Sequence, residues 1–303
     1  MIMLRYENCP ICKSGNRFLL GKPGRISEVF RKYSEISQVN IVRCADCSGK
    51  YIHPMMYFSP EFIQELYSLD YFNANGAVED FKNVGEKISI MAAVKRLYGD
   101  AHGKTMLDIG CGTGEFLKAG ADAGFEVTGI DVDRTTTEFV SGKYGFRTLT
   151  GLLEARTFPS ASFDVVVFSH VIEHLQEPTE LLAIIRSILK PQGLLLMCTP
   201  NNDSLGEDIH NVYGRFRYGR SKSYYLTPFT SPYHIIGFNL SSSRRILEQS
   251  GFAIEYCKLH SGLEWEEKRR KFIMWSIKVT GAMLRKGMSI VTISRKPGAA
   301  VLE

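Results

Sequence analysis

The sequence contains no long apolar run, little net charge and no internal repeat. No stretch of the 303 residues approaches the roughly 18 consecutive apolar residues that a membrane-spanning helix needs. The formal net charge is only +5, from 37 basic and 32 acidic residues. This mild charge suits a small ligand that bears phosphate, and it disfavours nucleic acid as the partner. What remains is a globular chain, long enough for one large domain and a small one.

The N-terminal stretch MIMLRYENCP has no apolar core of a signal peptide before its first cysteine, so we expect a cytoplasmic protein. Four of the seven cysteines form two C-x-x-C pairs. In a reducing compartment two such pairs predict a four-thiolate metal site rather than disulfides, because each knuckle directs two sulfurs at one ion. Structural zinc is expected, and rubredoxin-like iron or a lost site are the alternatives. The ligands would be Cys9, Cys12, Cys44 and Cys47.

The chain divides into three predicted parts. Residues 1–55 are expected to form a zinc ribbon, and 56–103 a helical linker or lid. Residues 104–298 alternate strands with helices, which predicts an α/β domain with a Rossmann-like, doubly wound parallel sheet. Its seven expected strands are 105–109, 125–130, 146–150, 163–168, 193–198, 253–259 and 288–294.

Two insertions interrupt this α/β pattern. Residues 200–238 are long and weakly periodic, which is typical of a lid or substrate loop. Residues 264–286 have a helical pattern with an apolar face beside four consecutive basic residues. Packing in the core or in a dimer is the expected role of this helix, and peripheral docking on a membrane surface is the alternative.

The most specific motif is the glycine-rich stretch Asp108-Ile-Gly110-Cys-Gly112-Thr-Gly114-Glu115. Glycines between a strand and a helix let backbone amides approach a ligand that a Cβ atom would block. A dinucleotide fingerprint would have glycine where Glu115 stands, and this carboxylate would repel a pyrophosphate at the helix N-terminus. The loop therefore predicts a cofactor without phosphates; the alternative is a purely structural turn.

This motif and the strands around it, from about residue 104 to 260, resemble the class I S-adenosylmethionine-dependent methyltransferases. The resemblance implies S-adenosylmethionine as cofactor, with its methionine end at Asp108, Gly110 and Gly112. An acid that closes the second strand would hold the ribose hydroxyls, and Asp131 matches it better than Asp133.

Adenine contacts depart from the family pattern, which usually has an acid after the third strand. Leu152 and Leu153 occupy that stretch, with Glu154 as a possible substitute. Apolar and backbone contacts to adenine are therefore expected.

The N-terminal part carries a second resemblance. Cys44-Ala-Asp-Cys47-Ser-Gly-Lys-Tyr-Ile-His-Pro54 and the stretch 66–72, LYSLDYF, are similar to zinc-ribbon methyltransferases of natural-product and cell-surface sugar clusters. This resemblance implies methylation of carbon or oxygen on nucleotide-linked deoxysugars.

Residues 168–175, FSHVIEHL, match the H-x-x-E-H pattern of one zinc-peptidase class. The match follows a predicted strand, however, and ligands of open α/β sheets bind at the carboxyl ends of strands. A peptidase is therefore disfavoured, and Ser169 and His170 are expected beside the cofactor.

Three roles remain open for the histidine motif. Glu173 and His174 can be structural, or His170 can act as a general base. Alternatively, His170, Glu173 and His174 can bind a divalent metal, because ubiquinone-pathway O-methyltransferases and small-RNA 2′-O-methyltransferases carry a similar E-x-x-E-H.

The acceptor side is expected after the fifth strand, beginning at Asn201. Basic residues alternate there with aromatic ones, a pattern that can hold a nucleotide diphosphate through ion pairs and stacking. An RNA contact or a solvated lid are the alternatives. His234, in a segment that resembles the family's P-x-H-x-x-x-F, is a second candidate base, a further metal ligand, or a packed side chain. The predicted acceptor-binding residues are Asn201, Tyr213, Arg215, Arg217 and Tyr224.

Together these patterns predict a methyltransferase that modifies oxygen or carbon of a small, phosphate-bearing molecule, with a nucleotide-linked or glycan sugar as the expected acceptor. A zinc-ribbon RNA methyltransferase and a non-catalytic scaffold that binds S-adenosylmethionine are the alternatives.

Overall fold

The computed structural model describes residues 3–5, 7–67, 84–260, 279–281, 283–284 and 286–298. Most of the expected helical insertion 264–286, with its proposed membrane contact, lies outside these residues, as does most of the stretch 66–72. Within the described ranges no helix combines the length and the apolar character needed to cross a membrane.

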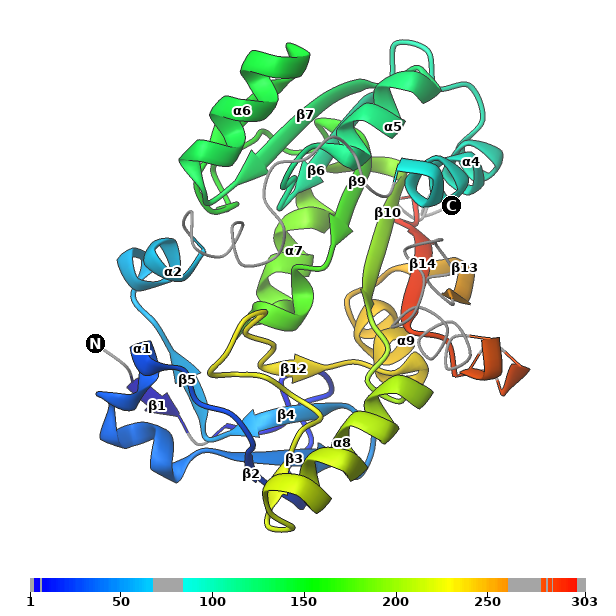
Figure 1. Ribbon diagram of the computed structural model, residues 1–303. Coiled ribbons are helices and arrows are strands. Elements are labelled where there is room, and N and C mark those ends of the chain that lie inside the picture. The colour runs from blue at the N-terminus through cyan, green and yellow to red at the C-terminus, as the bar shows by residue number, and fades with distance from the viewer. Residues whose placement is uncertain are drawn as a thin grey trace.

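A seven-stranded mixed sheet forms the centre of the upper part of the molecule (Figure 1). All seven expected strands are present, in the order β13-β14-β10-β9-β6-β7-β8. The sheet is not wholly parallel as expected, because β14 runs antiparallel to both of its neighbours. The strands are β6 (Thr105–Ile109), β7 (Glu126–Asp131), β8 (Arg147–Thr150), β9 (Phe163–Ser169), β10 (Leu189–Pro200), β13 (Ala253–His260) and β14 (Ser289–Arg295).

Helices cover both faces of this sheet because its central strands are apolar on both sides. Val165 and Val167 of β9 point to one face, where they join a buried cluster with α4 and α5. Val166 and Phe168 point to the other face and join the cluster that contains α7 and α9. This alternation is the period-2 geometry of a strand. The helices are α4 (Val84–Tyr98), α5 (Glu115–Ala123), α6 (Arg134–Tyr144), α7 (Pro178–Ile188) and α9 (Leu240–Gln249).

Local signals fix the helix ends near the predicted site. Asp133 caps α6, since its side chain accepts a hydrogen bond from the backbone of Thr136. Gly124 and Gly145 end α5 and α6 in the left-handed conformation that glycine adopts without strain. Asn239 and Ser242 form a capping box at the start of α9.

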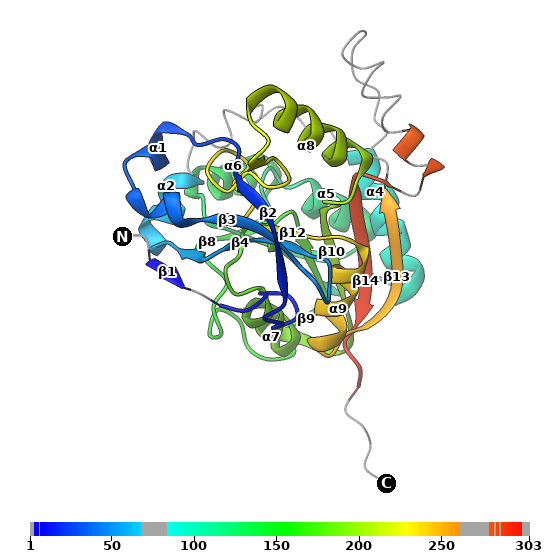
Figure 2. The same ribbon diagram turned by 90° about the horizontal axis from the view of Figure 1, so that it is seen from below.

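The N-terminal segment contributes three strands to a second, five-stranded sheet of order β11-β2-β3-β4-β12. Its outer strands β11 and β12 come from the insertion 200–238, so the two segments share one sheet. Figure 2 shows β2, β3, β4 and β12 side by side. The strands are β2 (Arg17–Pro23), β3 (Asn40–Cys44), β4 (Lys50–His53), β11 (Lys222–Ser223) and β12 (Ile236–Gly237).

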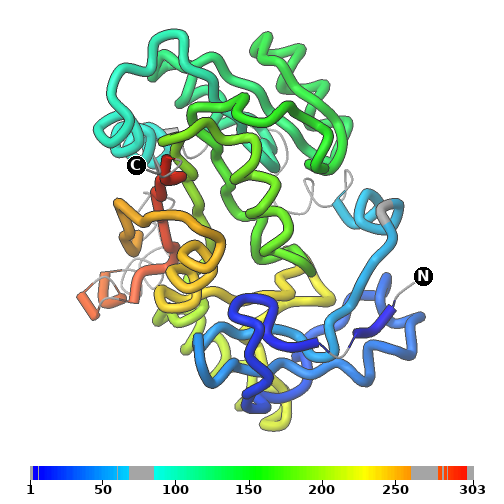
Figure 3. The backbone as a smooth tube through the Cα atoms, turned by 180° about the vertical axis from the view of Figure 1, so that it is seen from behind, coloured from blue at the N-terminus to red at the C-terminus, as the bar shows by residue number. Residues whose placement is uncertain are grey.

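Shorter elements complete the N-terminal part. β1 (Met3–Arg5) pairs antiparallel with β5 (Met55–Tyr57), and α1 (Glu28–Arg31) and a 3-10 turn (Ser34–Gln38) connect β2 to β3. α2 (Pro60–Leu66) lies between the upper and lower parts of the molecule in Figures 1 and 3, and α8 (Leu205–Tyr218) runs beside the second sheet. One buried apolar cluster extends from Ile41 and Ile52 of the second sheet to α7, which packs the two parts together.

Candidate methyl-transfer site

A cavity of about 460 Å³ opens at the carboxyl ends of β6, β7 and β9. Its volume lies in the range of small-molecule sites, roughly 300–1,000 Å³. Of the seven predicted cofactor residues, Asp108 alone does not line the cavity. The other six do: Gly110, Gly112, Asp131, Leu152, Leu153 and Ser169. The chain therefore brings the predicted cofactor residues from four different loops to one place.

The glycine loop is shaped by two different requirements. Gly110 has φ +68°, and a Cβ atom there would lie 2.4 Å from Cγ2 of Val171. Gly112 has φ +49°, but a Cβ atom there would meet no atom of the described residues within 4 Å. Gly110 is thus required by packing inside the protein. Gly112, which faces the cavity, leaves room for a ligand to approach the backbone.

Asp131 holds this loop in place. Its Oδ2 accepts a hydrogen bond from the amide of Gly112 at 3.0 Å, and its Oδ1 accepts one from the amide of Asp133 at 3.0 Å. Burial raises the pKa of Asp131. A carboxylate has further lone pairs, so Asp131 can still accept hydrogen bonds from a ligand in the cavity.

The other acids near the loop have different roles. Asp108 is buried behind the loop, and burial followed by the charges of Asp131 and Glu115 raises its pKa well above the usual range. Asp133 is occupied as the cap of α6. Glu154 is exposed and does not line the cavity.

The histidine motif begins with a strained residue at the end of β9. His170 has φ +54°, which is rare for a residue with a side chain, and its amide donates to the carbonyl of Cys198 at 2.9 Å. Such strain costs on the order of 1–3 kcal/mol and is concentrated at functional sites. Residues Ile172–His174 form a 3-10 turn. His170 and His174 therefore do not share a face of an α-helix, as a peptidase motif would require.

Glu173 is a buried carboxylate surrounded by imidazoles. Its side chain is 1% exposed, and its Oε1 lies 3.3 Å from Nδ1 of His170 and 3.8 Å from Nε2 of His234. Oε2 accepts a hydrogen bond from Oγ1 of Thr199. Burial raises the pKa of Glu173, but the three neighbouring histidines, His170 first among them, outweigh this effect and bring the pKa to about 2. Glu173 is therefore ionised at neutral pH.

His174 and His234 lie on the other side of Glu173, with their ring centres 5.0 Å apart. Nδ1 of His174 is 2.9 Å from the hydroxyl of Tyr67. Burial lowers the pKa of His174, and it lowers that of His234 to about 4 despite the nearby charge of Glu173. Both imidazoles are therefore neutral at pH 7.

The ligand atoms of Glu173, His174 and His234 lie within 4.8 Å of one another, so this group can hold a metal ion. Neutral imidazoles and an ionised carboxylate are the forms that bind metals. The expected ligands were His170, Glu173 and His174, with His234 as a candidate further ligand, and this group contains all of them except His170. The exposed His170 instead lines the cavity.

The four cysteines also converge, at the start of the second sheet. Sγ of Cys9 lies 3.7 Å from Sγ of Cys47, and Sγ of Cys12 lies 3.5 Å from Sγ of Cys44. These distances are too long for disulfides. They are close to the separation of about 3.8 Å that four Zn–S bonds of about 2.3 Å give in a tetrahedron. The donor set thus fits one tetrahedral ion.

The predicted acceptor-binding residues do not line this cavity. Asn201 is buried and donates to the carbonyl of Gly287 at 2.7 Å. Tyr213 is 57% exposed on α8, and Tyr224 is buried against Gly214. Arg215 and Arg217 belong to the last turn of α8. α8 packs beside the second sheet, and this packing carries the basic and aromatic run away from the cofactor loop.

Sequence reasoning missed the side chains that form the remaining wall. Phe58, with residues of and just after α2, lines the cavity, and α7 contributes a second apolar strip. The helical pattern of 60–66 is visible in the sequence, but its position over the cofactor loop is not. The described lining includes Glu177 and Glu180 but no lysine or arginine. The apolar lining residues include Ile63, Leu66, Tyr67, Leu181, Ile184 and Tyr233.

Comparison with known proteins agrees with this geometry. The sheet order, the glycine turn after β6 and the acid after β7 define a Rossmann-like α/β methyltransferase fold. Residues 85–256, more than half of the chain, match the family described as "Methyltransferase domain", and the chain belongs to this family.

Among curated proteins, a probable S-adenosylmethionine-dependent methyltransferase of Mycolicibacterium smegmatis is 32% identical over 162 residues, covering 53% of this chain and 56% of the relative. A ubiquinone biosynthesis O-methyltransferase of Actinobacillus pleuropneumoniae is 33% identical over 109 residues, covering 33% and 47%. The chain thus spans about half the length of these relatives. A solved S-adenosylmethionine-dependent methyltransferase from Mesorhizobium loti matches with a TM-score of 0.50 and 14% identity, over 70% of this chain and 100% of that one, which shows the shared fold.

Proposed function

We propose that this protein transfers a methyl group from S-adenosylmethionine to a small-molecule acceptor. The observation that carries the proposal is that one cavity contains both the glycine loop with Asp131 and the histidine motif. The cofactor, when bound, supplies an electrophilic methyl group on its sulfonium. The residues present fit it. Gly112 leaves space at the backbone, Asp131 offers acceptors for ribose hydroxyls, and Leu152 and Leu153 offer an apolar surface for adenine.

His170 is the proposed general base. Its Nδ1 faces Glu173 at 3.3 Å, so Nε2 is the nitrogen that would accept a proton from a hydroxyl or an activated carbon of the acceptor. The ionised carboxylate of Glu173 would stabilise the imidazolium that forms, in the manner of a base held by an orienting acid. His234, the other candidate base, is less accessible, since it does not line the cavity.

A divalent metal at Glu173, His174 and His234 is a second candidate for this part of the site. The observation in its favour is the convergence of three ligand atoms within 4.8 Å. A bound metal would orient an acceptor oxygen. Metal content measured in wild type and in a His174→Ala variant tests for this ion. A divalent metal that is present in wild type and lost in His174→Ala would support the metal site, whereas a general base at His170 requires no such ion.

We propose that the acceptor is a sugar, either linked to a nucleotide or part of a glycan. Glu177 and Glu180 in the cavity wall offer acceptors for sugar hydroxyls, while the apolar strips of α2 and α7 suit the less polar ring of a deoxysugar. Because no lysine or arginine is found among the described lining residues, the phosphates of a nucleotide-linked sugar would lie outside the cavity. Because some relatives are ubiquinone biosynthesis O-methyltransferases, a hydroxylated aromatic compound is the acceptor against which the sugar should be compared.

The four cysteines are the proposed ligands of a structural zinc ion. Four converging thiols with tetrahedral spacing support zinc. Iron is the alternative, and metal analysis of the purified protein distinguishes the two ions. A site that depends on free thiols is stable in a reducing compartment, and this supports a cytoplasmic location.

The test combines calorimetric binding of S-adenosylmethionine with transfer of a labelled methyl group. Asp131→Asn should weaken cofactor binding at least tenfold, about 1.4 kcal/mol, whereas Asp122→Asn on the exposed side of α5 should not. The acceptor panel contains a nucleotide-linked deoxysugar, a hydroxylated aromatic compound and RNA. Labelling of RNA alone would support the RNA alternative. Cofactor binding without labelling of any acceptor would support the scaffold, and no cofactor binding at all would refute the proposal.

A further inference from the structure

One chain segment connects the candidate methyl-transfer site with the second cysteine pair. Tyr233 lines the cavity, His234 faces Glu173, and the amide of Ile235 donates to the carbonyl of Glu173 at 3.0 Å. The carbonyl of Ile235 accepts from the amide of Ile52 in β4 at 3.1 Å. β12 then continues this pairing along β4, the strand that begins shortly after the second cysteine pair. The segment 233–237 is thus hydrogen-bonded to Glu173 on one side and to β4, which follows the second cysteine pair, on the other.

Lys50, the first residue of β4, carries a buried charge at this junction. Its side chain is 4% exposed, and its ammonium donates to the carbonyl of Asn202 at 2.7 Å and to Oδ1 of Asp203 at 2.5 Å. The ammonium also lies 4.2 Å from the ring centre of Tyr225. Burial lowers the pKa of Lys50, while Asp203 opposes this effect. A lysine buried to this degree is rare unless it is paired.

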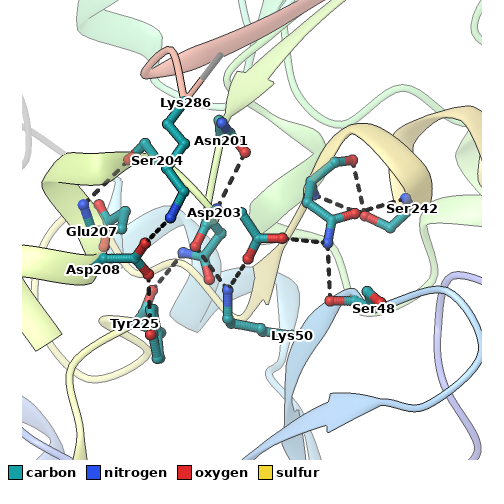
Figure 4. Close-up of polar contacts among 12 residues, drawn as sticks. Ser48, Lys50, Asn201, Asp203, Ser204, Glu207, Asp208, Tyr225, Ser242 and Lys286 are labelled. Atoms are coloured by element: carbon teal, nitrogen blue, oxygen red, sulfur yellow. Dashed lines mark hydrogen bonds and ion pairs between the residues drawn. The ribbon is translucent and has the colours of Figure 1, made fainter. Parts of the chain in front are cut away.

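A chain of hydrogen bonds leads from Lys50 through Asp203 to Ser48, as Figure 4 shows. Nδ2 of Asn239 donates to Oδ2 of Asp203 at 2.8 Å and to the carbonyl of Ser48 at 3.1 Å. Ser48 follows Cys47 directly. Three parts of the chain therefore meet here: the knuckle, the loop after β10 and the cap of α9.

Close packing leaves little freedom for these parts to move independently. A Cβ atom on Gly49 would lie 2.4 Å from Cδ1 of Ile11, a residue between the first two cysteines. A Cβ atom on Gly237 would lie 2.6 Å from the side chain of Asn202. A displacement of either knuckle must therefore be transmitted to β12 and to the residues that precede it.

We propose that Lys50 is a positioning residue that couples metal binding at the four cysteines to the geometry of the segment 233–235 beside Glu173. Lys50 touches neither the cavity nor the cysteines. It holds the start of β4 against Asn202 and Asp203, and β4 in turn holds β12. The inference rests on the proposed function for its catalytic consequence, but the structural coupling can be measured without any methyl transfer.

The experiment compares wild type with Lys50→Met and Lys50→Arg in the full chain. Lys50→Met keeps the length of the side chain and removes its charge, so that Asp203 loses its ion-pair partner and keeps only the hydrogen bond from Asn239. Lys50→Arg keeps the charge and a donor. Lys118→Met is the matched control, since Lys118 pairs with Asp122 on the exposed surface of α5. Amide hydrogen exchange of the peptide 233–239, zinc content and cofactor affinity are measured for each protein.

We expect at least tenfold faster exchange of the peptide 233–239 in Lys50→Met, with cofactor affinity within twofold of wild type. Removal of zinc from wild type should speed exchange of the same peptide, and removal from Lys50→Met should add little more. Lys50→Arg should restore at least part of the protection. Across these proteins kcat should fall as exchange of the peptide becomes faster, whereas the dissociation constant for the cofactor should not change.

Two results would overturn the coupling. The first is that folded Lys50→Met exchanges the peptide 233–239 as slowly as wild type. The second is that zinc removal speeds exchange of this peptide by the same factor in wild type and in Lys50→Met. If Lys50→Met does not fold, Asp203→Asn provides the same test with a milder change, because the carbonyl of Asn202 still accepts from Lys50. Absence of methyl transfer in wild type would count against the proposed function alone, since the exchange data do not depend on it.

Discussion

Replacing Gly112 by alanine separates the two reasons for a glycine in the cofactor loop. Gly112 has φ +49°, so an alanine there must adopt the left-handed conformation at a cost of about 1–2 kcal/mol. Within the part of the chain that the structure describes, no atom lies within 4 Å of the new methyl group, so it causes no steric conflict there. The amide of residue 112 is kept, and with it the hydrogen bond to Asp131. The methyl group would occupy space in the cavity, where a ligand approaching the backbone needs it.

Gly145→Ala is the matched control for this change. Gly145 ends α6 with φ +71°, a Cβ atom there would meet no described atom within 4 Å, and the residue does not line the cavity. Urea unfolding should show a similar loss of stability, about 1–2 kcal/mol, in both variants. Calorimetry should show S-adenosylmethionine binding weakened at least tenfold, about 1.4 kcal/mol, in Gly112→Ala only. Equal cofactor affinity in the two variants would refute the assignment of Gly112 to the cofactor site.

Three further outcomes are expected. Cys9→Ser should lose the bound zinc and unfold at lower temperature, measured by metal analysis and thermal unfolding. Cys257→Ser, outside the cluster, should keep its zinc and its unfolding temperature. Zinc that persists in Cys9→Ser would contradict the four-cysteine site. Glu173→Gln should lower kcat roughly 10–100-fold, because the neutral amide no longer stabilises the imidazolium that would form at His170, 3.3 Å away. Cofactor affinity should change little, and an unchanged kcat would exclude Glu173 as the partner of the base. Lowering the pH from 6.5 to 4 should destabilise the fold by about 3 kcal/mol through His234. Burial lowers the pKa of His234 from 6.5 to about 4, so the unfolded chain binds more protons in this window. Urea unfolding of His234→Asn should show a smaller loss over that range, and an equal loss would contradict the assignment.

The elements around the cofactor loop could be predicted almost to the residue because their signals are local. β6 occupies the expected range 105–109, and α5 (Glu115–Ala123) begins directly after the glycine turn. An apolar run, a glycine turn and a periodic helix follow one another there within 20 residues. The placement of Ser169 and His170 beside the loop was also predictable, because all parallel strands of such a sheet end at one edge.

Other parts of the site depend on contacts between distant segments. β11 and β12 are two residues long and have no periodic pattern, so their pairing with β2 and β4 could not be read from the insertion. The direction of β14 follows from its pairing between β10 and β13. The run of basic and aromatic residues predicted an acceptor site, but the packing of α8 turns that run away from the cavity.

By itself, the sequence determined the family, the cofactor loop with Asp131, and the two cysteine pairs, because each is a short motif whose spacing fixes its own geometry. The tertiary structure alone decided that α2 and α7 form the rest of the cavity wall. It also decided that His234 lies beside Glu173, and that the buried Lys50 at the start of β4 pairs with the loop after β10. These relations depend on burial and strand pairing between residues far apart in the chain, and no local pattern encodes them.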